Sequence, residues 1–105
     1  MIQTREQLRT LCHTRYGIPT SGAMALESYL FDREPPGSFF RALMENDFVS
    51  IFATADQVNR QLLRNYADLM YNELPTRSYG PGICPYGSAE NVKAWLEGDK
   101  NEHTL

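Results

Sequence analysis

Four side chains of this sequence can ligate a soft metal ion: Cys12, His13, Cys84 and His103. A structural zinc site takes four such ligands, usually supplied as two close pairs. Cys12 and His13 are adjacent on a predicted helix, where consecutive side chains point about 100° apart, and His103 lies close to the C-terminus. We therefore expect no metal site and no other cofactor, and we expect Cys12 to be a buried, small apolar residue.

Cys84 and Glu73 are the strongest candidates for a catalytic role. Cys84 lies in a segment rich in proline and glycine, close to the positive N-terminal end of the last predicted helix, where the pKa of a thiol can fall. The two histidines lie near the two ends of the chain, so the sequence places no general base beside this thiol. We predict that the protein is not an enzyme, with a small enzyme that uses Glu73, Asn72 and Cys84 as the alternative.

The segment 82–88 has the Gly-x-x-x-x-Gly spacing of a phosphate-binding loop and leads directly into the last predicted helix. Backbone N–H groups and the helix dipole at such a terminus favour anions. A P-loop ATPase is excluded, because no lysine follows Gly87 and no strand is predicted before the loop. One interpretation is a nucleotide held by backbone amides, with Tyr79 or Tyr86 stacked on its base and Arg77 paired with its charge. The other interpretations are a structured turn and a protein-binding loop with the same anchors.

The residues that precede this loop are more polar than the end of a helix requires. Tyr71, Asn72 and Glu73 come directly before the segment 75–87, which is rich in proline, glycine and tyrosine. We therefore predict one ligand- or partner-binding site, formed by Tyr71, Asn72, Glu73, Arg77, Tyr79, Cys84, Tyr86, Gly87 and Ser88.

Apolar residues recur with helical spacing along nearly the whole chain, and no alternating strand pattern of useful length is present. Thr4 and Gln7 form a capping box, and Asp47, Asp56 and Ser88 are N-cap candidates. We predict an all-α fold, a compact bundle of five to six short helices with a Pro/Gly/Tyr-rich loop before the last helix. The predicted helices cover about residues 4–17, 21–34, 38–46, 47–55, 56–74 and 88–98, with one kinked helix over 38–55 as an alternative.

The helix over 56–74 is predicted to be the longest. Its core stripe comprises Val58, Leu62, Tyr66, Leu69 and Met70, broadened by Leu63, Ala67 and Leu74. The preceding helix carries four apolar residues at helical spacing, Phe48, Ile51, Phe52 and Ala55. At the junction before it, Glu45 and Asp47 flank Asn46, a position that favours helix capping over acid–base chemistry.

The chain has 105 residues, 42% of them hydrophobic, which predicts one helical domain over 1–98 and a polar tail over 99–105. Two cysteines are too few for a disulfide-rich secreted scaffold, and no run of 18 apolar residues is present to span a membrane. We therefore expect a cytoplasmic protein. The net charge of −3, with no basic cluster beyond the first 20 residues, argues against bulk nucleic-acid binding. Twelve aromatic residues are hard to bury completely in so short a chain, so we expect a homo-oligomer.

Four short segments resemble, in their order, a family of small proteins encoded by bacteriophages and prophages. The segments are PPGSF (35–39), ENDF (45–48), YNELP (71–75) and GSAENVKAW (87–95). The family typically has PPGxF, ENDL, YNExP and GSxxxVxxW at these places, and the resemblance covers about residues 26–96. This chain departs from the pattern by an additional segment, 78–82, which lengthens the connection before the last helix.

The resemblance implies a phage context and no particular chemistry. A phage protein of this size without a recognisable active site is interpreted as an accessory binding protein that inhibits a host process, most concretely antiviral defence. It would bind a defence protein or sequester a nucleotide-type signal. The alternatives are a phage assembly or host-takeover adaptor and the small enzyme described above.

Overall fold

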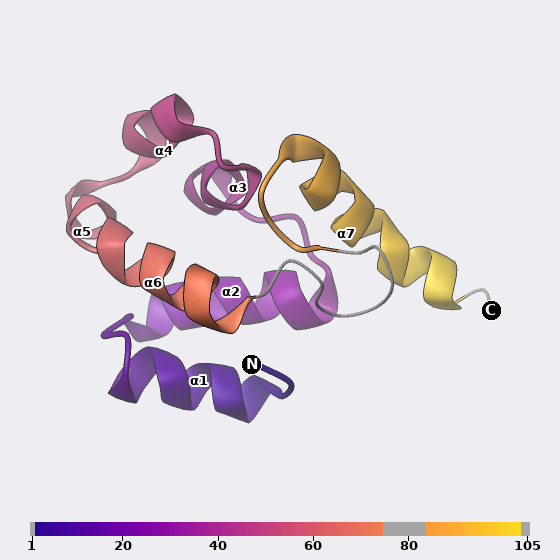
Figure 1. Ribbon diagram of the computed structural model, residues 1–105, viewed down its shortest axis with the longest axis horizontal. Coiled ribbons are helices and arrows are strands. Elements are labelled where there is room, and N and C mark those ends of the chain that lie inside the picture. Colours follow the sequence, from indigo (N-terminus) through magenta and orange to yellow (C-terminus); the bar gives the residue numbers. More distant parts are fainter. Residues whose placement is uncertain (1, 75–83, 104–105) are drawn as a thin grey trace.

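The computed structural model describes residues 2–74 and 84–103. Over these residues the chain forms seven α-helices and no strand, which confirms the all-α prediction (Figure 1). The helices are α1 (Arg5–Thr14), α2 (Thr20–Asp32), α3 (Ser38–Glu45), α4 (Phe48–Thr54), α5 (Gln57–Gln61), α6 (Leu63–Glu73) and α7 (Ala89–His103). Every helix in this part of the chain is too short or too polar to cross a membrane.

Side-chain caps begin four helices at the residues that the sequence predicts. The Thr4 hydroxyl and the Gln7 side chain form the reciprocal capping box of α1. Asp47, Asp56 and Ser88 each accept a hydrogen bond from the backbone N–H three residues later, at 2.7–3.3 Å. These bonds satisfy N–H groups that have no partner inside the helix.

Three predicted boundaries differ in the structure. The prediction of one helix over 56–74 is wrong, because α5 and α6 are separated at Leu62, whose N–H donates to the Asn59 carbonyl only three residues back, at 3.1 Å. The alternative prediction of one kinked helix over 38–55 is also wrong, since Asn46 adopts a left-handed φ of 58° and ends α3. The predicted end at Gly98 is wrong as well, because α7 continues to His103. A helix tolerates an internal glycine at a cost of about 1 kcal/mol.

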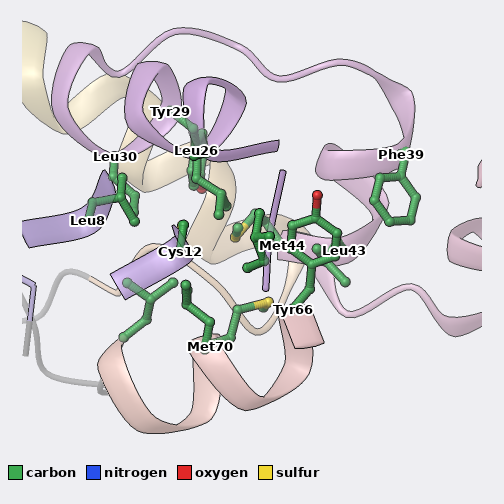
Figure 2. Close-up of a cluster of buried hydrophobic side chains, with 14 of the residues drawn as sticks. Leu8, Cys12, Leu26, Tyr29, Leu30, Phe39, Leu43, Met44, Tyr66 and Met70 are labelled. Atoms are coloured by element: carbon green, nitrogen blue, oxygen red, sulfur yellow. The ribbon is translucent and has the colours of Figure 1, made fainter. Parts of the chain in front are cut away.

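The core is formed mainly by α1, α2, α3 and α6 (Figure 2), and Ile51 of α4 and Val92 and Trp95 of α7 also belong to it. Figure 2 shows side chains from these helices pointing toward one another: Leu8, Cys12, Leu26, Tyr29, Leu30, Phe39, Leu43, Met44, Tyr66 and Met70. The Cys12 side chain is buried, as predicted, and this burial raises the pKa of its thiol to about 11. Cys12 is therefore a packing residue that stays protonated at neutral pH.

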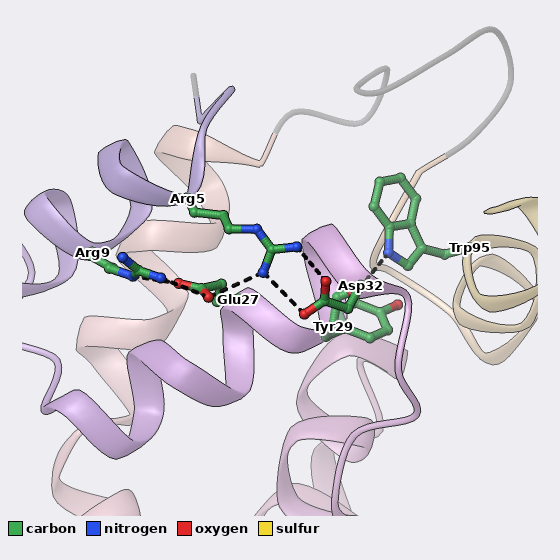
Figure 3. Close-up of polar contacts among 6 residues, drawn as sticks. All are labelled: Arg5, Arg9, Glu27, Tyr29, Asp32 and Trp95. Carbon is green, nitrogen blue, oxygen red and sulfur yellow. Dashed lines mark hydrogen bonds and ion pairs between the residues drawn. The ribbon is translucent and has the colours of Figure 1, made fainter.

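Helices α1 and α2 lie side by side and are joined by ion pairs (Figures 1 and 3). The Arg5 guanidinium pairs with Asp32 and, at 3.2 Å, with Glu27. The Arg9 Nε donates to the same Glu27 carboxylate at 2.6 Å. Exposed ion pairs contribute little to stability individually, so these contacts mainly orient α1 against α2.

Helix α7 and the turn before it are attached to α2 and to the segment that follows it. The Trp95 indole donates to the Tyr29 carbonyl at 3.0 Å (Figure 3). The Arg33 guanidinium lies 3.4 Å above the centre of the Trp95 ring and donates to the Trp95 carbonyl at 2.7 Å. The Tyr29 hydroxyl donates to the Pro85 carbonyl at 2.5 Å. The bond to Pro85 holds the turn 84–88, which forms one wall of the site described next.

Candidate functional site

An apolar groove lies where α3, α4 and α6 meet the turn 84–88. Its volume is about 390 Å³, toward the lower end of the range of about 300–1,000 Å³ for ligand pockets. None of the described residues that line it is charged. They are Leu43, Asn46, Phe48, Ile51, Phe52, Leu63, Ala67, Met70, Tyr71, Tyr86 and Gly87.

Helix α4 supplies the aromatic side of the groove. The left-handed Asn46 ends α3, and Asp47 then caps α4, so the chain changes direction between the two helices. Of the apolar residues of α4, Ile51 is buried whereas Phe48 and Phe52 are exposed. A helix of seven residues with apolar side chains on several faces can bury only the face that it turns to the core.

Three exposed aromatic residues surround the recess. Phe48 is 70% exposed, Phe52 43% and Tyr71 83%. The floor is apolar and mostly buried, with Leu43 and Met70 among its residues. Exposed apolar side chains grouped around a recess are typical of binding surfaces in soluble proteins.

The turn 84–88 is held in place by hydrogen bonds through its own backbone. The Gly87 N–H donates to the Met44 carbonyl at 2.7 Å, and the Tyr86 carbonyl accepts from the Asn91 amide at 2.9 Å. The Cys84 thiol is half-buried and lies 3.1 Å from the same Tyr86 carbonyl, to which it donates. Gly87 has a φ of 115°, a conformation that favours glycine. In its described part, the loop is therefore a structured turn, and the Gly87 amide is already bonded within the protein.

The structure brings together only part of the predicted site. Tyr71, Tyr86 and Gly87 line the apolar groove, and Ser88 caps α7. Asn72 is exposed, and Glu73 is buried against other partners. Consecutive helical residues point about 100° apart, and neither Asn72 nor Glu73 is among the described lining residues of the groove. That these two residues share one site with Tyr71 stays a prediction. Two further predicted residues, Arg77 and Tyr79, lie outside the described part of the chain.

Glu73 joins the end of α6 to the connection between α1 and α2. Its carboxylate accepts a hydrogen bond from the Tyr16 hydroxyl at 2.6 Å, and Arg15 lies 4.0 Å away. The bond from Tyr16 lowers the pKa of Glu73, although burial opposes this effect. Burial and the same bond raise the pKa of the Tyr16 hydroxyl. These contacts give the polar Glu73 a structural role.

Eight residues that line the groove are outside the predicted site: Leu43, Asn46, Phe48, Ile51, Phe52, Leu63, Ala67 and Met70. Helical spacing assigns the last three to a core stripe, and only Met70 of these is buried. Val58, also assigned to that stripe, is 59% exposed. The available signal was the density of apolar residues in α4, which exceeds what one buried face can hold.

Comparison with models of protein families, with curated proteins and with solved structures finds no match to this chain. The apolar groove, its aromatic rim and the absence of charge from its described lining residues are therefore the observations that bear on function.

Proposed function

We propose that this protein is a non-enzymatic binding protein whose binding surface is the apolar groove. The observation that carries the proposal is the exposure of Phe48, Phe52 and Tyr71 around a recess with uncharged lining residues. Aromatic residues that insert between partners supply much of the energy of protein interfaces. The partner is a protein that presents apolar side chains, such as the apolar face of a helix laid into the groove.

The chemistry of the groove favours a protein partner over a nucleotide-type signal. Phosphates are held by arginine and lysine side chains or by free backbone N–H groups. The described lining contains neither arginine nor lysine, and the Gly87 N–H is bonded to the Met44 carbonyl. An apolar recess with an aromatic rim offers a phosphate few donors, but it offers an apolar side chain a place to be buried.

We further propose that the protein is phage-encoded and acts in the cytoplasm of a bacterial host, where it inhibits an antiviral defence protein. This step rests on the resemblance of the segments 35–39, 45–48, 71–75 and 87–95 to small phage proteins. A phage assembly or host-takeover adaptor would use the same groove and is the second candidate. The exposed aromatic rim also supports the self-association that the aromatic content predicts.

The test is a plaque assay with matched variants. Bacteria that each carry one antiviral defence system express the wild-type protein, Phe48→Glu or Met24→Gln, and are challenged with a phage that the system restricts. Phe48 is the first residue of α4 and is exposed, so an acidic residue there suits the helix dipole and preserves folding. Met24 is an exposed apolar residue of α2 that does not line the groove.

We expect the wild-type protein and Met24→Gln to restore plaques in one defence strain, and Phe48→Glu to restore none. If Phe48→Glu restores plaques as well as the wild type, the apolar groove is not the binding surface. If the wild type restores plaques in no strain, the proposal of defence inhibition is contradicted.

A further inference from the structure

We propose that, without another partner, the apolar groove binds a second copy of this chain. The result is a two-fold symmetric dimer in which Phe48 of each copy enters the groove of the other. The dimer itself does not depend on the proposed function. Its consequence does: a dimer formed in this way covers the surface that a host protein would use, so self-association and partner binding compete.

This face of the molecule is suited to contact a second copy of itself. A two-fold interface uses the same surface on both copies, so that surface must carry both a projection and a recess that accepts it. Phe48 projects from the first turn of α4, with its ring against that of Phe52. The recess beside it has the apolar side chains of Leu43, Leu63 and Met70 in its lining. Rotation about a two-fold axis can therefore place each projection opposite the other copy's recess.

The exposed apolar area of this face suits a weak contact. Phe48, Phe52 and Tyr71 are 70%, 43% and 83% exposed, and an aromatic side chain has about 150–250 Å² of surface, so together they present roughly 400 Å². Patches of about 300–600 Å² are the largest that monomers usually expose. Interfaces below about 1,200 Å² in total belong to weak complexes. The surface thus fits a weak dimer.

The distribution of charge also favours contact at this face. Two copies with a net charge of −3 repel each other, so their contact is favoured where charge is absent or balanced. The groove lining has no charged residue among those described. On two helices that line the groove, charges of opposite sign are paired within the helix: Arg41 with Glu45 on α3, at 3.4 Å, and Arg64 with Asp68 on α6, at 4.0 Å. Asp47, the N-cap of α4, is exposed and adds one negative charge beside Phe48. Among the described residues, this face therefore carries little net charge to oppose a second copy.

Sedimentation equilibrium of the full chain tests the dimer. Wild type, Phe48→Glu, Tyr71→Glu and the control Met24→Gln are measured from about 2 µM to 500 µM, so that a weak dimer is followed from dilute to concentrated protein. We expect the average mass of wild type and Met24→Gln to rise from 12.0 kDa toward twice that value. Both glutamate variants should stay at the monomer mass, because each places two added negative charges in the symmetric interface. Circular dichroism and thermal melting of each variant check that it is folded.

The proposal is overturned if the wild type stays at 12.0 kDa over the whole range, or if folded Phe48→Glu and Tyr71→Glu dimerise like the wild type. A mass that grows past the dimer also overturns it, because a closed two-fold contact leaves no free copy of the surface. The experiment contains no host protein, so its failure is independent of the plaque assay. A monomer that still restores plaques would end the dimer proposal alone.

Discussion

The rings of Phe48 and Phe52 meet edge to face, with centroids 5.0 Å apart and planes at 67°. Aromatic pairs of this geometry usually lie inside a protein or an interface, but both of these residues are exposed. Because the rings already pack against each other, a partner has less side-chain freedom to remove when it binds. The pair is thus arranged in advance for contact with an apolar surface.

Substitutions in α4 should distinguish residues that stabilise the fold from residues that serve in binding. Ile51 is buried, and Ile51→Ala is expected to lower the free energy of unfolding by about 2–5 kcal/mol. Phe48 is exposed, and Phe48→Ala is expected to change this free energy by less than about 0.5 kcal/mol. Urea denaturation of dilute protein measures both. If both variants lost the same free energy of unfolding, Phe48 would belong to the core.

Gly22 and Tyr66 offer a test of packing between α2 and α6. A Cβ added at Gly22 would lie 2.1 Å from the Tyr66 hydroxyl oxygen, which has no hydrogen-bond partner among the described residues. Gly22→Ala is expected to destabilise the protein by about 1–3 kcal/mol through overpacking. Tyr66→Phe should be neutral or stabilising, since it removes an unsatisfied buried hydroxyl.

The double variant Gly22→Ala, Tyr66→Phe completes a double-mutant cycle with the two single variants. The clashing oxygen is then absent, so Gly22→Ala should cost less than it does in the wild-type background. Urea denaturation of the four proteins gives the interaction free energy. Strictly additive effects would contradict the close approach of Tyr66 to Gly22.

The stability of the protein should depend on pH partly through Glu73. The hydrogen bond from Tyr16 lowers the pKa of Glu73 in the folded protein. The stabilisation of the folded protein by ionised Glu73 is therefore present above the pKa of an unfolded glutamate, about 4.3. It is lost as the pH falls through the lower pKa that Glu73 has in the folded protein. Glu73→Gln should be less stable than wild type at pH 7, and the difference should shrink between about pH 5 and pH 3. Urea midpoints across this range test the prediction, and parallel profiles would contradict it.

Tyr29→Phe should loosen the turn that forms one wall of the groove. The substitution removes the donor to the Pro85 carbonyl, and a buried acceptor left without its partner costs about 1–3 kcal/mol. Trp95 is the single tryptophan and bonds to the Tyr29 carbonyl, so its fluorescence reports unfolding. Tyr71→Phe, which changes an exposed hydroxyl, is the control and should leave the unfolding midpoint unchanged. An equally unchanged midpoint for Tyr29→Phe would show that its bond to Pro85 does not stabilise the turn.

Local sequence signals predicted most of the fold. Caps at Thr4, Asp47, Asp56 and Ser88 depend on neighbouring residues only, and the structure confirms them. The division at Leu62 carries no glycine or proline signal, and its neighbours are compatible with a continuous helix. Periodicity therefore could not separate α5 from α6.

The groove was less predictable, because it is formed by residues that only tertiary packing brings together. Tyr71 and Tyr86 were identified as site residues, and both line the groove. Helical spacing predicts an apolar face that includes Phe48 and Phe52. It does not show whether another element covers that face. The exposure of these two rings follows from the direction that α4 takes after Asn46.

The most direct test of the groove as the binding surface is photo-crosslinking in bacterial cells. A benzophenone derivative of phenylalanine replaces Phe48, Tyr71 or, as the control, Met24, and irradiation is followed by mass spectrometry of the adducts. We expect defined adducts from positions 48 and 71, with a second copy of the chain or with a host protein, and little adduct from position 24. Equal adducts from position 24, or none from positions 48 and 71, would contradict the groove as the surface through which this protein acts.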